Sequence, residues 1–195
     1  QSRSSAASDV YKRQHLYQLM GTSTLVATSK SSSANSYCTL AEADQYHDDR
    51  PAVSTTWADA SENNKIRALL WATRLMESLF TWTGYATTTT QALGWPRTGL
   101  LDRIDASLDS DTVPEEVKDA EAEFARQLLV ANRGQDNEIE AQGISSIKAG
   151  SVFLQFTASQ YNKVCPDLVY MMIPSAWFSS VRGRISPTRI VERAS

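Results

Sequence analysis

The sequence predicts a mainly α fold, a small helical bundle that carries a β-hairpin and has extended termini. Three observations support this fold class. Two long segments repeat apolar residues at intervals of three and four, helix start and stop signals flank them, and the pattern after Gly134 shortens to two brief, partly alternating runs. The 195 residues are 42% hydrophobic, which is enough for one domain with a substantial core.

The first helix is expected from Leu40 to about Asp49. Thr39 and Glu42 have the spacing of a capping box, in which the hydroxyl and the carboxylate satisfy free amides at the helix start. The helix ends before Arg50-Pro51, because a residue that precedes proline avoids the α conformation.

The second helix is expected from Ser61 to about Phe80 and has two apolar faces. The main face has the spacing of a buried stripe and contains Ile66, Leu69, Leu70, Thr73, Met76 and Phe80. The second face contains Trp71, Leu75 and Leu79. Two interpretations of this second face stay open: it packs against a neighbouring subunit, or it closes the monomer core against the third helix.

The third helix is expected to begin at Pro114, whose missing amide costs nothing at a first helical position. It ends at the stop signal of residues 132–134. Its core stripe contains Val117, Ala120, Phe124 and Leu128. Residues 139–147 and 151–156 then form the hairpin, and a final short helix begins at Pro174 and carries Ala176, Trp177, Phe178 and Val181.

The chain divides into three parts by composition and charge. Residues 1–14 resemble translated adapter sequence, and with the Ser- and Thr-rich approach they make residues 1–35 a flexible segment outside the fold. Residues 36–181 form a single domain. Residues 182–195 form a basic tail with four arginines against one glutamate, whereas residues 15–181 hold 12 basic and 20 acidic residues, a net charge of −8.

Catalytic and metal chemistry have little support in the sequence. The two histidines are His15 and His47, and no nucleophile motif, phosphate loop or dinucleotide fingerprint occurs. The acidic loop of residues 102–111 lacks the ligand order of a calcium loop. Cys38 and Cys165 form no metal or disulfide pattern, which favours a reducing compartment. No apolar run approaches the length of a membrane span. We therefore expect no catalytic residue, no cofactor and no metal ion.

One set of aromatic residues has a possible role in nucleic-acid binding. Trp82, Tyr85 and Trp95 could stack on bases beside Arg97. The alternative is that they pack as core at a corner between a helix and a loop, with Trp95 and Arg97 fixing the long loop. The acidic body favours packing, since nucleic-acid binding needs a basic face.

A longer pattern of motifs resembles a known family. In order along residues 36–132, the matching segments are Ser36-Tyr37, Leu40-Ala41-Glu42-Ala43-Asp44 with Tyr46, the Trp57 loop, Ala72-Thr73-Arg74, Gln91-Ala92-Leu93, Trp95-Pro96-Arg97-Thr98-Gly99, and Val113-Pro114 with Val117-Lys118-Asp119-Ala120. This pattern is similar to the head-to-tail connector (adaptor) proteins of tailed phages. Some members of that family are labelled DnaT-like single-stranded DNA-binding proteins.

The resemblance implies a non-enzymatic virion protein that is assembled in the host cytoplasm. It implies a homo-oligomeric ring, typically of twelve, that binds the portal protein and tail or stopper proteins. DNA would pass through its channel without specific binding, and no membrane is involved. The alternative is a DnaT-like accessory protein that binds single-stranded DNA. The expected interaction residues are Trp71, Leu75, Leu79, Trp95, Arg97, Arg182, Arg184, Arg189 and Arg193. Arg97 could also pair with an acidic neighbour across a subunit boundary.

Overall fold

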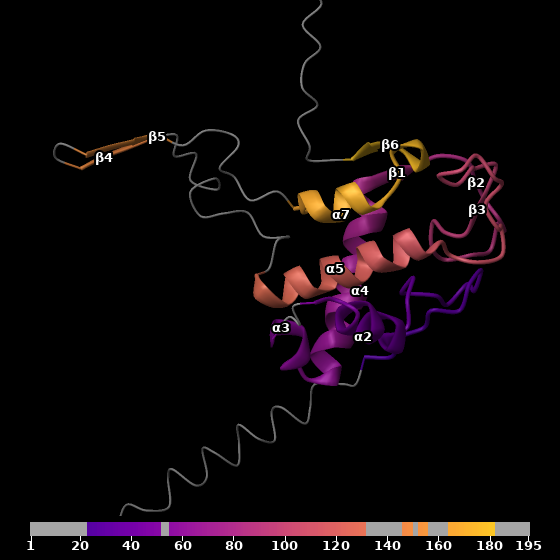
Figure 1. The fold of residues 1–195 in the computed structure, drawn as a ribbon, viewed down its shortest axis with the longest axis horizontal. Helices are drawn as coiled ribbons and strands as arrows, with labels where there is room; N and C mark the ends of the chain where they lie inside the picture. The colour runs from indigo at the N-terminus through magenta and orange to yellow at the C-terminus, as the bar shows by residue number, and fades with distance from the viewer. Residues whose placement is uncertain (1–22, 52–54, 132–145, 150–151, 156–163, 182–195) are drawn as a thin grey trace, which may run out of the picture.

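The fold is mainly α, as the sequence predicts. The computed structural model describes residues 23–51, 55–131, 146–149, 152–155 and 164–181 (Figure 1). Its α-helices are α2 (Leu40–Asp48), α3 (Thr55–Ala58), α4 (Glu62–Leu79), α5 (Glu115–Val130) and α7 (Asp167–Met172). A 3₁₀ turn, η2 (Ser175–Trp177), follows α7. Its strands are β1 (Phe80–Trp82), β2 (Tyr85–Ala86), β3 (Arg97–Thr98), β4 (Ser146–Ala149), β5 (Val152–Gln155) and β6 (Phe178–Val181).

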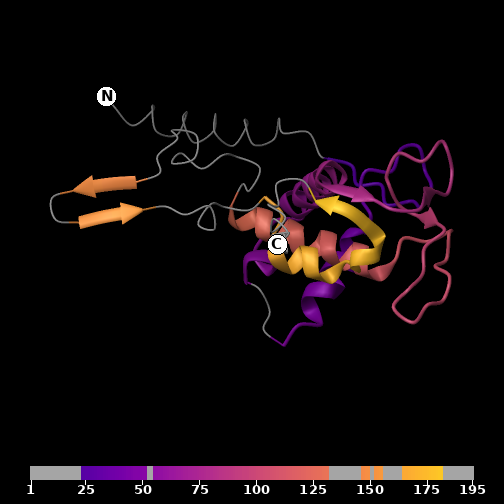
Figure 2. The same cartoon turned by 90° about the horizontal axis from the view of Figure 1, so that it is seen from above.

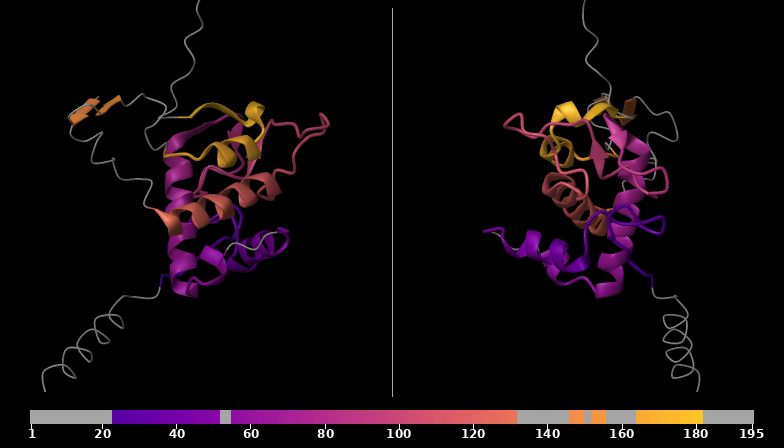
Figure 3. Two further views of the ribbon diagram at one scale, coloured as in Figure 1. Left: turned by 60° about the vertical axis from the view of Figure 1, so that its left-hand side comes forward. Right: turned by 90° about the vertical axis from the view of Figure 1, so that its right-hand side faces the viewer.

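The helix α5 is the centre of the arrangement. It crosses α4, with α2 and α3 on one side and α7 on the other (Figure 1). Figure 3 shows α4 standing along one flank of the body, so that one side of this long helix faces away from the other elements. The flank position explains why α4 has both a deeply buried face and an exposed one.

Local signals explain where the first two predicted helices begin. Thr39 accepts a hydrogen bond from the Glu42 amide while the Glu42 carboxylate accepts from the Thr39 amide, which confirms the capping box. Ser61 caps α4 by accepting from the Asn64 amide. The third predicted helix, α5, begins one residue later than expected, because Pro114 has an extended backbone and is the N-cap residue itself.

The C-terminal region differs from the prediction. The helix there is α7, which precedes Pro174, and only the single turn η2 follows that proline. Residues 178–181 form β6 rather than a helix, because they pair antiparallel with β1, whose first residue, Phe80, leaves the helix for an extended conformation (Figure 2). Because β1 and β6 are far apart in the chain, their pairing leaves no pattern in the local sequence that would predict a strand.

The two other strand pairs are short. The strands β2 and β3 pair through Tyr85 with Thr98 and Ala86 with Arg97. The predicted hairpin is present as β4 and β5, paired from Ser146 with Gln155 to Ala149 with Val152. Lys148 and Ala149, which the sequence places between the two predicted strands, belong to β4. The expected strand residues 139–145, 151 and 156 lie outside the described part.

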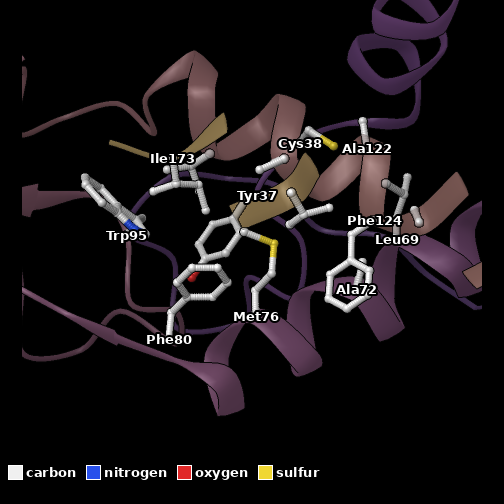
Figure 4. Close-up of a cluster of buried hydrophobic side chains, with 14 of the residues drawn as sticks. Tyr37, Cys38, Leu69, Ala72, Met76, Phe80, Trp95, Ala122, Phe124 and Ile173 are labelled. Carbon is white, nitrogen blue, oxygen red and sulfur yellow. The ribbon is translucent and has the colours of Figure 1, made fainter. Parts of the chain in front are cut away.

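The core lies where α4, α5, the segment of residues 36–38 and the C-terminal elements meet. Figure 4 shows Tyr37, Met76 and Phe80 in contact on one side of this core, with Phe124 and Ala72 on the other. The predicted stripe of α5 is buried at Val117, Ala120 and Phe124, whereas Leu128 is half-buried. Among the described helices, none is both long and apolar enough to cross a bilayer.

The described body also includes residues 23–35, which the sequence assigns to a flexible segment. The Val26 amide donates to Asn35 Oδ1, and Lys30 Nζ lies 2.8 Å from Asp111 Oδ1. The Ala92 amide donates to the Ser31 carbonyl. These contacts hold the segment against the loops near α5, so the boundary expected at residue 36 falls inside the described body.

Candidate functional site

The exposed side of α4 carries a stripe that combines polar, basic and aromatic residues. Its members follow the three- and four-residue spacing of one helix face: Asn64, Arg67, Trp71, Arg74 and Ser78. Arg67 is half-buried and the other four are exposed. The opposite side of the same helix holds Leu69, Ala72 and Met76, which have no exposed surface. We call these five residues the α4 stripe.

Two open hollows flank the α4 stripe. One has a volume of about 360 Å³ and lies between α4 and α5, where Asn64, Arg67, Ala68, Trp71, Leu128 and Leu129 line it. The other has a volume of about 480 Å³ and is lined by Ala34, Asn35, Thr73, Arg74, Glu77, Ser78 and Leu93. A ligand that followed the stripe would therefore meet a recess on either side of Trp71 and Arg74.

Most other basic side chains are already committed within the fold. The described residues hold 17 acidic and 10 basic side chains. Ion pairs join Lys30 with Asp111, Arg50 and Arg126 with Glu123, Lys65 with Asp44, Arg103 with Glu116, and Lys118 with Glu42. Arg67 also has an interaction partner. Arg74 is exposed on the α4 stripe, one helical turn from Trp71. The stripe is therefore where positive charge meets an exposed aromatic ring.

The second pairing of tryptophan with arginine lies where the long loop after β2 enters β3, with Trp95 before the strand and Arg97 as its first residue. Trp95 is 2% exposed, and its ring contacts Trp82 and Trp177 at centroid distances of 5.6 and 5.3 Å. Arg97 donates to the carbonyls of Thr83, Gly84 and Gly94 at 2.5–2.9 Å. Trp95 and Arg97 thus fix the long loop, the packing role that the sequence analysis set against base stacking. Tyr85 is the exception, because it is 77% exposed.

The proposed second apolar face of α4 does not act as one unit. Leu79 is 8% exposed within the core, and Leu75 packs against the core while half-buried. Trp71 alone of these three is 41% exposed. Leu75 and Leu79 therefore close the monomer, and only Trp71 is left for a partner. The other expected interaction residues, Arg182, Arg184, Arg189 and Arg193, lie outside the described residues.

Two buried titratable groups have structural partners. The carboxylate of Glu121 accepts hydrogen bonds from Ser36 Oγ, Thr73 Oγ1 and the amides of Tyr37 and Cys38, at 2.6–2.9 Å. Burial outweighs these donors and raises the pKa of Glu121 to about 7. His47 is also buried, 3.2 Å from the Ala122 carbonyl, and burial lowers its pKa.

Neither group belongs to a recognisable catalytic arrangement. Glu121 ties residues 36–38 to the two central helices, which is a structural task. Over the described ranges, no group of three or more His, Cys, Asp or Glu side chains could hold a metal ion. The aspartates beside His47 are exposed, while its own ring points into the core.

Comparison with known proteins gives a family match. The model of the family described as "Putative DnaT-like ssDNA binding protein" matches residues 24–188. The chain belongs to this DnaT-like family. No curated protein and no solved structure matches the chain. The match begins within the segment of residues 23–35, in agreement with its contacts to the body.

The sequence predicts an interaction role for Trp71 but not for the rest of the α4 stripe. Asn64, Arg67 and Arg74 recur at the spacing of one helix face around Trp71, a signal that was present in the sequence. This spacing does not by itself indicate a binding site, because charged residues on one face of a helix ordinarily mark the side that faces solvent. Only burial separates Trp71 from the other tryptophans.

Proposed function

We propose that this chain binds single-stranded DNA and does so without catalysis. The observation that carries the proposal is the exposed Trp71 beside Arg67 and Arg74, in a chain of the DnaT-like family. Proteins that bind single strands without sequence preference combine cations that contact the backbone with aromatic rings on which bases stack. The net negative charge of the rest of the body restricts such binding to a local surface, so we expect modest affinity.

A second candidate function is the head-to-tail connector, and a different surface favours it. Ile104 and Met171 are 82% and 72% exposed, and Leu101 and Leu168 are about half exposed. Arg103 donates to the Met172 carbonyl at 3.0 Å, which joins their loop to α7. Exposed apolar side chains gathered in this way are typical of protein–protein contacts. A connector would use them between ring neighbours, or against portal, tail or stopper proteins.

One experiment separates the two functions. Light scattering on the full chain, with and without purified portal protein, gives the mass of any assembly, and a titration with a single-stranded oligonucleotide at low salt gives its affinity. We expect a small species that binds the oligonucleotide with an affinity that falls as salt rises. A chain that ignores the oligonucleotide and forms a ring-sized complex only with portal would overturn the first proposal in favour of the connector.

A further inference from the structure

We propose that the α4 stripe is the binding site for single-stranded DNA, with one base stacked on Trp71 and the adjacent phosphates held by Arg67 and Arg74. This assignment rests on the function proposed above and adds the site, the contacts and the number of phosphates. The described residues contain no second surface where an exposed aromatic ring lies between two basic residues of one helix face.

The exposure of Trp71 distinguishes it from the other tryptophans. Trp57, Trp95 and Trp177 are at most 2% exposed, and Trp82 is stacked on Phe80 at a centroid distance of 4.9 Å. A base therefore has access to the ring of Trp71 without any change in the core. Covering an exposed indole with a base removes apolar surface from water and adds stacking, so this contact gives affinity that does not depend on salt.

The two arginines are placed to hold a backbone that passes over the ring. Arg67 and Arg74 lie four residues before and three residues after Trp71, which separates them by about 10 Å along the helix axis. Each guanidinium presents several donors that suit phosphate oxygens. Two phosphates, one on either side of the stacked nucleotide, can then be contacted together.

The carboxylate that lines the hollow beside Arg74 does not oppose this arrangement strongly. Glu77 lines the same hollow as Arg74, but its oxygens accept hydrogen bonds from the Tyr37 hydroxyl, from Trp82 Nε1 and from the Gly94 amide. Those three donors draw the charge of Glu77 toward the core. Arg74 thus keeps its positive charge at the surface of a body that is negative elsewhere.

The hollow between α4 and α5 offers a place for the neighbouring base. Its lining includes the apolar residues Ala68, Leu128 and Leu129 and the polar residue Asn64. Apolar side chains accommodate the face of a base. The side-chain amide of Asn64 has both a donor and an acceptor, so it can form a hydrogen bond with the edges of different bases. We therefore expect the site to bind DNA of different base sequences and to cover a few nucleotides of one single strand.

The test compares stripe variants with matched variants elsewhere on the full chain. Binding of a short fluorescein-labelled oligothymidylate is followed by anisotropy over a series of salt concentrations. The stripe variants are Trp71→Ala, Trp71→Phe, Arg67→Gln and Arg74→Gln. The controls are Tyr85→Ala, an exposed aromatic residue on β2, and Arg103→Gln, an exposed arginine beside α7. Thermal melting checks that every variant is folded.

The two residue types have different expected signatures. Trp71→Ala should weaken binding roughly 5- to 150-fold with an unchanged dependence on salt, and Trp71→Phe should recover most of the loss. Arg67→Gln and Arg74→Gln should each reduce the slope of log K against log[salt] by about 0.7. The controls should bind as the wild type does. Indole fluorescence should be quenched by the oligonucleotide in the wild type and much less in Trp71→Phe.

Three results would overturn the proposal. If the wild type binds and the stripe variants bind equally well, the site is wrong while the DNA-binding function stands. If the wild type does not bind the oligonucleotide, the function and the site fail together. If Trp71→Ala dissociates an assembly that forms without DNA, the stripe is occupied by a second copy of the chain rather than by a nucleic acid.

Discussion

The chain pairs tryptophan with arginine in two places, and the fold uses them in opposite ways. In the loop, Trp95 is buried and Arg97 donates to three backbone carbonyls. On α4, Trp71 is exposed and Arg74 lies beside it on the surface. The loop pair belongs to one of the motifs that carry the family resemblance, Trp95-Pro96-Arg97-Thr98-Gly99, yet it holds the fold together. A distinctive motif can therefore mark a structural requirement, while a functional surface leaves a weaker pattern.

The sharpest test of this comparison is to remove each indole. Trp95→Ala should lower the free energy of unfolding by about 3–5 kcal/mol, because it opens a cavity between Trp82 and Trp177. Trp71→Ala should change it by no more than about 0.5 kcal/mol, since surface substitutions away from special features have small effects. Urea unfolding followed by circular dichroism measures both values. Equal losses would contradict the division into a structural and a surface tryptophan.

A second large effect is expected at the buried carboxyl group of Glu121. Glu121→Ala leaves the amides of Tyr37 and Cys38 without acceptors in the core, which should cost about 3 kcal/mol. Glu121→Gln should cost much less, because its amide oxygen can accept from both backbone amides. Its NH₂ group can donate to Ser36 and Thr73, whose hydroxyls also reach the carbonyls of Cys38 and Leu69.

The same residue predicts a dependence of stability on pH. The pKa of Glu121 is raised to about 7 in the folded protein, above its ordinary value of 4.5. Between these values the folded state keeps a proton that the unfolded state has lost, so the contribution of Glu121 to stability falls as pH rises from about 4.5 to 7.

His47 has a lowered pKa and acts in the opposite direction, so its contribution to stability is lost as pH falls through 6.5. The difference in unfolding free energy between wild type and Glu121→Gln isolates the glutamate. A difference that does not change over this range would contradict the raised pKa.

A smaller effect is expected for the arginine of the loop. Arg97→Ala removes the donors to the carbonyls of Thr83, Gly84 and Gly94 and should lower the free energy of unfolding by about 1–3 kcal/mol. Arg97→Lys keeps the charge but cannot reach three carbonyls in a planar fork, so it should restore only part of the loss. Thermal or urea unfolding distinguishes the variants. If Arg97→Ala unfolds as the wild type does, the loop does not depend on this residue.

The smallest effect on stability is expected for the arginine of the α4 stripe. Arg74→Gln should change the free energy of unfolding by less than about 0.5 kcal/mol, because the residue is exposed. Its effect should appear instead in the binding of oligothymidylate. A marked loss of stability in Arg74→Gln would show that this arginine, like Arg97, is part of the fold.

The sequence predicted helices well and strands poorly. The starts of α2 and α4 were readable because Thr39, Glu42 and Ser61 act on amides within one turn of themselves. The strand β6 was mistaken for a helix, since its partner β1 lies about a hundred residues earlier, and Ser179 reaches the Thr81 carbonyl across 98 positions. The candidate site is predicted only in part. The sequence indicates Trp71, but it groups Trp71 with Leu75 and Leu79, which pack in or against the core.

The sequence by itself determined the fold class and the main helices, because these depend on residue types and on contacts between near neighbours. Only the tertiary structure decided which tryptophan and which arginine remain at the surface. Trp71 and Trp95 are the same residue type, and their burial depends on which segments pack over them. Packing joins residues that are distant in the chain, as it does when Trp177 covers Trp95, and local patterns do not record it.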